Sequence, residues 1–154
     1  MLEGLWTYRS FFNRYDRVDS DANAALALLF GEGLLKLTRL QTGNYTGGLS
    51  FGDGLDLNLE CKILRDSDPF EFAWIGTGLA GKPTEGWRYD YRGYLSHQWP
   101  NAIDQVPALV GTVIRTLAHG DNAPAGVTAS FIAVKHPERD DDDVSAPRAP
   151  SFLT

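Results

Sequence analysis

The sequence predicts an all-β protein: an eight-stranded antiparallel up-and-down barrel with one short helix inserted between strands 1 and 2. Segments in which apolar and polar residues alternate, many of them aromatic or β-branched, recur along the 154-residue chain. Turns rich in Gly, Pro and Asp separate these segments. So many consecutive antiparallel strands protect their sheet edges most simply by closing into a barrel, whose interior is filled by side chains or holds one small ligand.

Turn residues set the expected strand boundaries. Strands are expected at residues 4–12, 33–41, 45–51, 55–64, 70–79, 86–96, 108–118 and 126–135. Thr42-Gly43-Asn44 and Gly52-Asp53-Gly54 read as short hairpin loops on either side of the third strand. The connection at residues 97–107 is rich in proline and large side chains, so we expect it to fold over one rim of the barrel. The barrel closes when the last strand pairs with the first.

An Ala- and Leu-rich segment at residues 21–30 predicts the short helix, with Asp19 or Ser20 as its N-cap. A helix of two or three turns has marginal stability on its own, so its large apolar residues must pack against another part of the protein. These residues are Leu26, Leu29 and Phe30. We expect them to cover the open end of the barrel.

Residues 1–136 are expected to form a single barrel domain, followed by a disordered tail at residues 137–154. The tail contains the acidic run from Asp140 to Asp143 together with prolines and small polar residues. Such a composition buries too little apolar area to offset the entropy lost on ordering. A role in binding a partner is an alternative for the tail.

Charge and hydropathy argue against two classes of partner. The net charge is −6 and no cluster of Lys and Arg is present, so no nucleic acid is expected as a partner. No run is long enough to span a bilayer, and the first residues lack the apolar core of a signal peptide, so no membrane is expected either. A cytoplasmic location follows, unless a signal peptide has been removed. A homo-oligomer is possible.

Cysteine and histidine usage predicts no metal site and no cofactor. Cys61 is the only cysteine and lies on the apolar side of an alternating strand, as expected of a buried structural thiol. The three histidines are His97, His119 and His136. Their spacing does not place two on one strand face, which argues against a metal site. Two imidazole–carboxylate pairs are candidates for acid–base chemistry: His97 with Asp104, and His119 with Asp121.

Two segments resemble known small barrels. Gly4-Leu5-Trp6 on the first strand resembles the Gly-x-Trp opening of lipocalins, fatty-acid-binding proteins and avidins. The stretch Gly86-Trp87-Arg88-Tyr89-Asp90-Tyr91 is similar to the Gly-Trp-led aromatic strand of avidins. The resemblance implies a calycin-type barrel that binds small ligands, with Trp6 closing one end. The helix-bearing insert and the 97–107 connection depart from avidin, and the last strand offers no carboxylate of the kind that avidins place near their ligand.

Strand alternation identifies the candidate site. If Trp6 points inward, as the resemblance implies, the other residues on its face do so too and meet the aromatic faces of the fifth and sixth strands. The expected ligand-binding residues are Trp6, Tyr8, Ser10, Trp74, Trp87, Tyr89, Tyr91 and Arg115. The alternative is that these aromatic residues fill a packed core. Arg115, in an apolar run, either stacks on Trp6 at the closed end or contacts an anionic ligand.

The sequence therefore predicts a small-molecule binding protein that holds an apolar or aromatic ligand in an aromatic-lined cavity, with the helix controlling access. One alternative is a cofactor-independent isomerase or cyclase that uses the same cavity, with Tyr89, His97 or His119 transferring a proton. Another is an accessory module that serves a partner enzyme through its acidic tail. A catalyst needs a titratable group facing the cavity, whereas a carrier does not.

Overall fold

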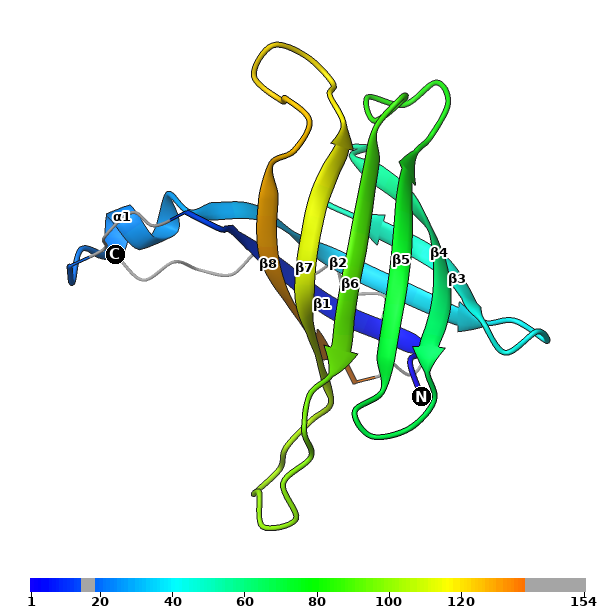
Figure 1. Ribbon diagram of the computed structural model, residues 1–154. Helices are drawn as coiled ribbons and strands as arrows, with labels where there is room; N and C mark the ends of the chain where they lie inside the picture. The colour runs from blue at the N-terminus through cyan, green and yellow to red at the C-terminus, as the bar shows by residue number, and fades with distance from the viewer. Residues whose placement is uncertain (15–18, 138–154) are drawn as a thin grey trace, which may run out of the picture.

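Eight antiparallel strands follow one another around a closed barrel, and the last strand pairs with the first (Figure 1). This arrangement, seen in a computed structural model that describes residues 1–14 and 19–137, confirms the predicted fold class. Most of the expected acidic tail lies outside these residues. Within the described ranges, no helix is long and apolar enough to cross a membrane.

The observed elements lie close to the expected ones. The strands are β1 (Gly4–Phe12), β2 (Leu29–Arg39), β3 (Tyr45–Ser50), β4 (Asp56–Arg65), β5 (Glu71–Gly78), β6 (Arg88–Leu95), β7 (Ala108–Leu117) and β8 (Thr128–Lys135), and the helix is α1 (Ala22–Leu26). Both expected hairpin loops are present, since Leu40 N donates to Asn44 O and Phe51 N donates to Leu55 O.

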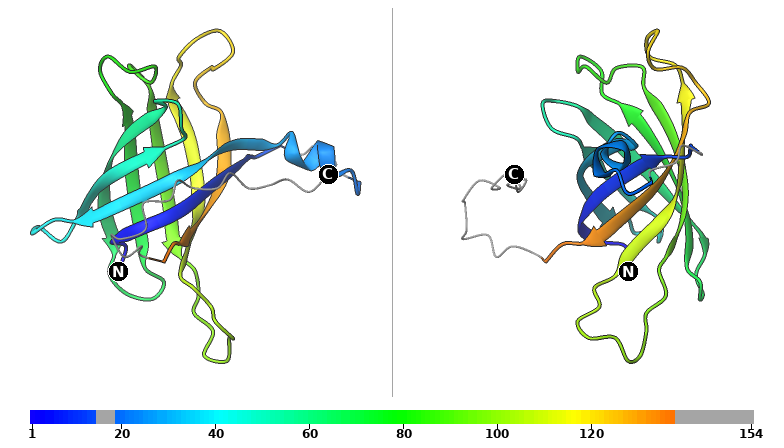
Figure 2. Two further views of the ribbon diagram at one scale, coloured as in Figure 1. Left: turned by 180° about the vertical axis from the view of Figure 1, so that it is seen from behind. Right: turned by 90° about the vertical axis from the view of Figure 1, so that its left-hand side faces the viewer.

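The antiparallel order sorts the connections between two ends of the barrel. The β1–β2, β3–β4, β5–β6 and β7–β8 connections lie at one end, which we call the open end (Figure 1). The other three connections and the N-terminus lie at the opposite end, which we call the closed end (Figures 1 and 2). Segments far apart in the sequence therefore meet at each end.

Aromatic side chains fill the middle of the barrel. The ring of Phe131 on β8 is 5.7 Å from that of Tyr8, 5.4 Å from that of Trp74 and 5.9 Å from that of Tyr91. Phe72 stacks on Trp74 at 4.5 Å. All five residues are buried, and for Tyr8, Phe72, Trp74 and Tyr91 the alternation on β1, β5 and β6 predicts this.

Trp6 is buried near the closed end. Its side chain is fully buried, and its indole Nε1 donates to the carbonyl oxygen of Leu2 at 2.9 Å. The Lys135 ammonium lies 4.9 Å from the centre of the Trp6 ring and donates to the carbonyl oxygen of Glu3. The cation over Trp6 is thus Lys135, and the expectation that Arg115 stacks there is wrong, because Arg115 lies on β7 toward the open end.

The helix is shorter than expected and lies elsewhere. α1 has five residues, none of them buried, and its N-cap is Asp21, whose carboxylate accepts from Asn23 N at 2.9 Å. Leu26 is 60% exposed, so the helix does not cover the barrel mouth; it lies on an arm beyond the ends of β1 and β2 (Figures 1 and 2). The reason is strand pairing. Phe11 pairs with Leu29, so residues 29 and 30 extend β2 instead of ending a marginal helix.

The connection between β6 and β7 projects away from the closed end instead of folding over a rim (Figure 1). Trp99 is 68% and Ile103 is 91% exposed. Gln105 stabilises the connection from within, because its side chain accepts from Trp99 N and donates to the carbonyl oxygen of His97, both at 2.8 Å. The backbone N–H of Trp99 and the carbonyl oxygen of His97 are therefore hydrogen-bonded within the connection and not to the barrel rim.

Cys61 is buried, as expected. Burial raises the pKa of its thiol to about 12, with a smaller opposing contribution from the neighbouring Trp74. Such a thiol stays protonated and unreactive at neutral pH.

Thr84 ties the β5–β6 connection to β4 near the open end. Its hydroxyl, in a side chain with no exposed surface, donates to the carbonyl oxygen of Asp56 at 2.7 Å and accepts from Leu79 N at 3.2 Å. Replacing the hydroxyl by a methyl group of similar size would leave both backbone groups unpaired.

We expect Thr84→Val to lower the free energy of unfolding by about 1–3 kcal/mol, the usual cost of unsatisfied buried backbone groups. Urea denaturation measures the change. Thr46→Val is the matched control, because Thr46 is exposed on β3 and donates to a single carbonyl oxygen, that of Leu59. Its effect should stay within about 0.5 kcal/mol. Equal effects of the two substitutions would contradict this role of Thr84.

Candidate functional site

A pocket of about 340 Å³ lies inside the open end of the barrel. Its lining comes from β1, β2, β6, β7 and the β3–β4, β5–β6 and β7–β8 connections. The lining residues are Tyr8, Ser10, Phe30, Gly31, Glu32, Phe51, Leu55, Trp87, Tyr89, Tyr91, Arg115 and His119. Closure of the sheet is what brings these distant segments together.

Tyr8 and Tyr91 form the floor, since they line the pocket and also contact Phe131 in the packed core. Burial raises the pKa of Tyr8 to about 12, although hydrogen bonds to Ser10 and Tyr91 partly oppose the shift. Burial also raises the pKa of Tyr91 well above its ordinary value of 10.0. Both hydroxyls therefore stay protonated at neutral pH and can offer or accept a hydrogen bond without carrying charge.

Aromatic rings form the walls. Phe51 meets Tyr8 edge to face at 6.1 Å, and Phe30 meets Tyr89 in the same way at 6.1 Å. Space between the walls depends on Gly31, because a Cβ atom there would lie 3.0 Å from the Phe51 ring. The walls thus present ring faces and edges suited to an apolar or aromatic molecule.

A polar cluster of Arg115, Tyr89 and His119 lies against these rings. Arg115 on β7 is paired with Tyr89 on β6, next to a register shift, and its Nε donates to the Tyr89 hydroxyl at 3.2 Å. The same hydroxyl lies 2.7 Å from His119 Nε2. The His119 ring stacks on Trp87 at 3.9 Å with an interplanar angle of 16°. Hydrogen bonding and stacking therefore hold the phenol and the imidazole in place.

The protonation state of the cluster follows from its charges. The pKa of His119 is lowered from its ordinary value of 6.5, first by burial and second by the positive charge of Arg115. A neutral imidazole results at pH 7. Because Arg115 already donates to the Tyr89 oxygen, the Tyr89 hydrogen is free to point at His119 Nε2, which accepts it. The chain then runs from Arg115 through Tyr89 to His119.

Arg115 is buried without a carboxylate. It is 8% exposed; one terminal nitrogen donates to the carbonyl oxygen of Pro124 at 3.1 Å, and the guanidinium lies 5.2 Å from the centre of the Phe30 ring. Asp90 on the neighbouring strand is engaged elsewhere, since its carboxylate accepts from the Thr116 hydroxyl at 2.7 Å and from Arg88 at 3.3 Å. Among the described residues, Arg115 has no ion-pair partner.

The structure brings together most of the expected site residues. Tyr8, Ser10, Trp87, Tyr89, Tyr91 and Arg115 line the pocket, and so does His119. Trp6 and Trp74 do not line it; both are buried in the core between the pocket and the closed end.

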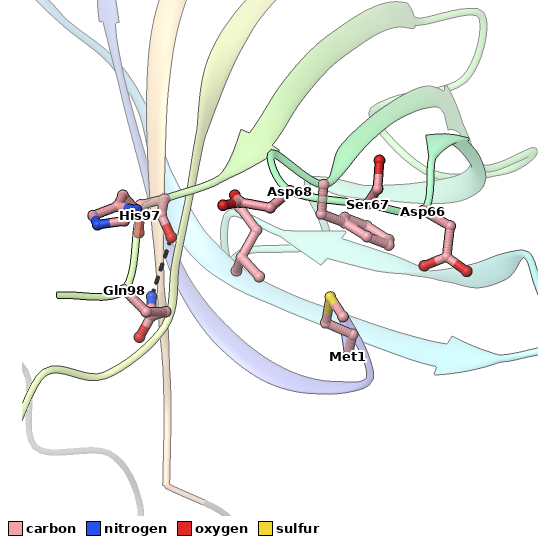
Figure 3. Close-up of a pocket in the computed structure, with 9 residues that line it drawn as sticks. Met1, Asp66, Ser67, Asp68, His97 and Gln98 are labelled. Atoms are coloured by element: carbon pink, nitrogen blue, oxygen red, sulfur yellow. Dashed lines mark hydrogen bonds between the residues drawn. The ribbon is translucent and has the colours of Figure 1, made fainter. Parts of the chain in front are cut away.

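His97 lies far from this cluster. It lines a second pocket, of about 260 Å³, at the closed end, together with Met1, Asp66 and Asp68 (Figure 3). There the Gln98 side chain donates to the carbonyl oxygen of Ser96 at 3.2 Å. Tyr89 and His97, two of the acid–base candidates, thus lie at opposite ends of the barrel.

Neither expected imidazole–carboxylate pair forms. The partner of His97 is the Trp99 ring, at 4.8 Å, and not Asp104. His119 pairs with the hydroxyl of Tyr89 and not with Asp121. Both carboxylates belong to exposed loop residues, which water solvates at no cost.

Five lining residues were not among the expected ligand-binding residues: Phe30, Gly31, Glu32, Phe51 and Leu55. Of these, Phe30 was expected at the open end, but as part of the helix and not of β2. Phe51 could have been found, because it continues the inward alternation of Tyr45 and Leu49 on β3. Phe30 could not be found in this way, since a register shift between Ser10 and Phe11 interrupts the alternation opposite it.

In the described part of the chain, no three His, Cys, Asp or Glu side chains lie close enough to bind a metal ion. No protein-family model matches the chain, and no curated protein or solved structure does so either. The geometry of the open-end pocket is therefore the evidence for a function.

We expect the His119 imidazole to titrate below 6.5 in a nuclear magnetic resonance titration of the folded protein, because burial and Arg115 both disfavour its charged form. Arg115→Gln should move the midpoint upward by removing one of these causes. Arg92→Gln makes the same charge change on an exposed residue of β6 and should leave the midpoint in place. A His119 midpoint at or above 6.5 in the unaltered protein would contradict the assignment.

The lowered pKa of His119 also affects stability. The folded protein binds this proton less readily than the unfolded chain, so the contribution of His119 is present above the unfolded pKa of about 6.5 and is lost as the pH falls below it. We expect the unfolding free energy of His119→Gln to fall less between pH 7 and pH 5 than that of the unaltered protein, measured by urea denaturation. Parallel pH profiles would contradict this linkage.

Proposed function

We propose that the protein binds a small apolar or aromatic molecule in the open-end pocket, in the manner of calycin-type barrels. The observation that carries the proposal is the incomplete filling of the barrel. The packed aromatic rings reach Tyr8 and Tyr91 and stop there, and above them lies a pocket with ring walls and a buried polar cluster. A barrel whose only need was stability would gain from filling this space.

Pocket size indicates the size of the ligand. Ligand pockets range from about 300 to 1,000 Å³, and the volume of about 340 Å³ here is at the lower limit. A molecule of one or two fused rings would fit between Phe30, Phe51 and Trp87. Stacking and edge-to-face contacts with these rings supply affinity, and the hydroxyls at the floor supply orientation.

A second candidate function is cofactor-independent proton transfer, which the chain from Arg115 through Tyr89 to His119 favours. His119 Nε2 would accept the Tyr89 hydroxyl proton while the Tyr89 oxygen takes a proton from a substrate carbon, which leaves a negative charge on the substrate and a positive charge on His119. Arg115 would stabilise the partial negative charge that develops on the Tyr89 oxygen during the transfer. Return of the proton to another carbon of the same molecule completes an isomerisation. No oxidant is consumed.

The two functions differ in their dependence on the Tyr89 hydroxyl. With 2-tetralone as a carbon-acid probe in D₂O, a proton-transfer catalyst would accelerate deuterium incorporation, and Tyr89→Phe would abolish the acceleration. A pure binding protein would hold the ketone without accelerating exchange. Proton nuclear magnetic resonance of the ketone distinguishes the two outcomes.

The binding function makes a prediction for two tryptophans at opposite ends of the barrel. We expect the neutral fluorophore N-phenyl-1-naphthylamine to bind at one site, with emission raised by transfer to an apolar pocket. Trp87→Ala should weaken binding by about tenfold or more, since it removes a ring that lines the pocket. Fluorescence titration measures the affinity.

Trp99→Ala is the matched control, because Trp99 lies on the exposed connection at the closed end. This variant should bind the fluorophore with the same affinity as the unaltered protein. Thermal unfolding of both variants shows that they remain folded. The proposal fails if the unaltered protein does not bind the probe, or if both substitutions weaken binding equally.

A further inference from the structure

We propose that the ligand of the open-end pocket carries a carboxylate or an equivalent anionic oxygen group, which binds to Arg115. This inference rests on the proposed function and names the chemical class of its ligand. The evidence is a buried guanidinium that lines the pocket, has unused donors and has no carboxylate of its own in the described residues.

The donors of Arg115 are only partly used. A guanidinium has five N–H donors in one plane and cannot lose its proton in a protein. One donor, on Nε, goes to the Tyr89 hydroxyl, and one, on a terminal nitrogen, goes to the carbonyl oxygen of Pro124. This leaves three N–H groups on the two terminal nitrogens without a protein partner in the described residues. Two terminal N–H groups side by side match the two oxygens of a carboxylate.

The positive charge also lacks compensation. A buried charge is costly unless it is paired, and the rings of Phe30 and Tyr89, 5.2 and 5.8 Å from the guanidinium, compensate it only weakly. Asp90 is held on the outer face of β6 by Thr116 and Arg88. An anionic ligand would supply the missing negative charge.

Glu32 is the acidic side chain among the lining residues, and it does not block an anion. It is exposed, pairs in register with Arg9 of β1 and makes no ion pair with Arg115. The net charge of −6 is spread over the whole chain. At physiological salt the screening length is about 8 Å, so distant carboxylates have little effect inside the pocket.

The cluster holds Arg115 in position for this task. Tyr89 fixes the Nε side of the guanidinium and Pro124 fixes one terminal nitrogen, while the guanidinium carbon lies over the Phe30 ring, 5.2 Å from its centre. A preorganised guanidinium loses little conformational entropy when an anion binds. The aromatic rings of the walls and this preorganised guanidinium together suit the pocket to a small aromatic acid whose carboxylate binds Arg115.

The experiment compares naphthalene-2-carboxylate with naphthalene-2-carboxamide, which has nearly the same shape and no charge. At pH 7 we expect the acid to bind the full chain about tenfold or more tightly than the amide, as measured by calorimetry. Arg115→Gln should reduce this preference to about one. Arg115→Lys, which keeps the charge and loses the planar fork, should show an intermediate preference.

Arg92→Gln is the matched control. It removes one positive charge from an exposed residue of β6 that pairs with Glu71, and the preference for the acid should persist. Should Arg115→Gln fail to fold, the side-chain Nε–H resonance of Arg115 in the unaltered protein gives a second measurement. The acid should shift this resonance, and the amide should not.

The outcomes separate this inference from the proposed function. If the unaltered protein binds neither compound, the proposed function fails and this inference fails with it. If it binds both within about twofold, the binding function stands and the anionic ligand is overturned. If a folded Arg115→Gln variant retains the preference for the acid, another group holds the anion and the role of Arg115 is overturned.

Discussion

The narrow interior of an eight-stranded barrel controls how this protein is built. Such an interior is just wide enough for side chains to fill it, so a few large rings at one level occupy the whole cross-section. Phe131, in contact with Tyr8, Trp74 and Tyr91, does this at mid-height, and Trp6 is fully buried nearer the closed end. Among residues 1–14 and 19–137, no such group of rings fills the open end, where Gly31 occupies an inward position. The pocket exists because the aromatic packing stops there.

The polar cluster depends on the same closure. Arg115 and Tyr89 lie on paired strands, and His119 reaches the phenol from the connection that follows β7. The stacking of His119 on Trp87 links this connection to the β5–β6 connection, which Thr84 anchors to β4. Rigid strands thus carry two members of the cluster, and a tethered connection carries the third. This support keeps a buried guanidinium and a neutral imidazole within reach of one hydroxyl.

Sequence patterns predicted the faces of the strands well and positions along the barrel axis poorly. Strand alternation has a period of two, so one inward residue on β1 identifies its neighbours, and Tyr8 and Ser10 are buried with Trp6. Alternation carries no information about depth, so it could not separate Trp6 and Trp74 in the core from Trp87 in the pocket. Residues 21–30 have local helix propensity, but Leu29 pairs with Phe11 of β1, so the chain forms a strand from Leu29 onward. The partner of His119 is 30 residues away, beyond the reach of any local pattern.

The charges of the cluster would couple the proposed ligand binding to proton transfer. Arg115 lowers the pKa of His119 because the two positive charges would repel each other. An anion on Arg115 offsets that repulsion and so returns the pKa of His119 toward its ordinary value. By linkage, the same coupling makes a protonated His119 favour the anion. Tyr89 lies between the two and can exchange a proton with His119, whereas Arg115 keeps its own protons. An acidic ligand would therefore increase the basicity of the group that a proton-transfer reaction needs, and binding and catalysis would draw on the same buried guanidinium.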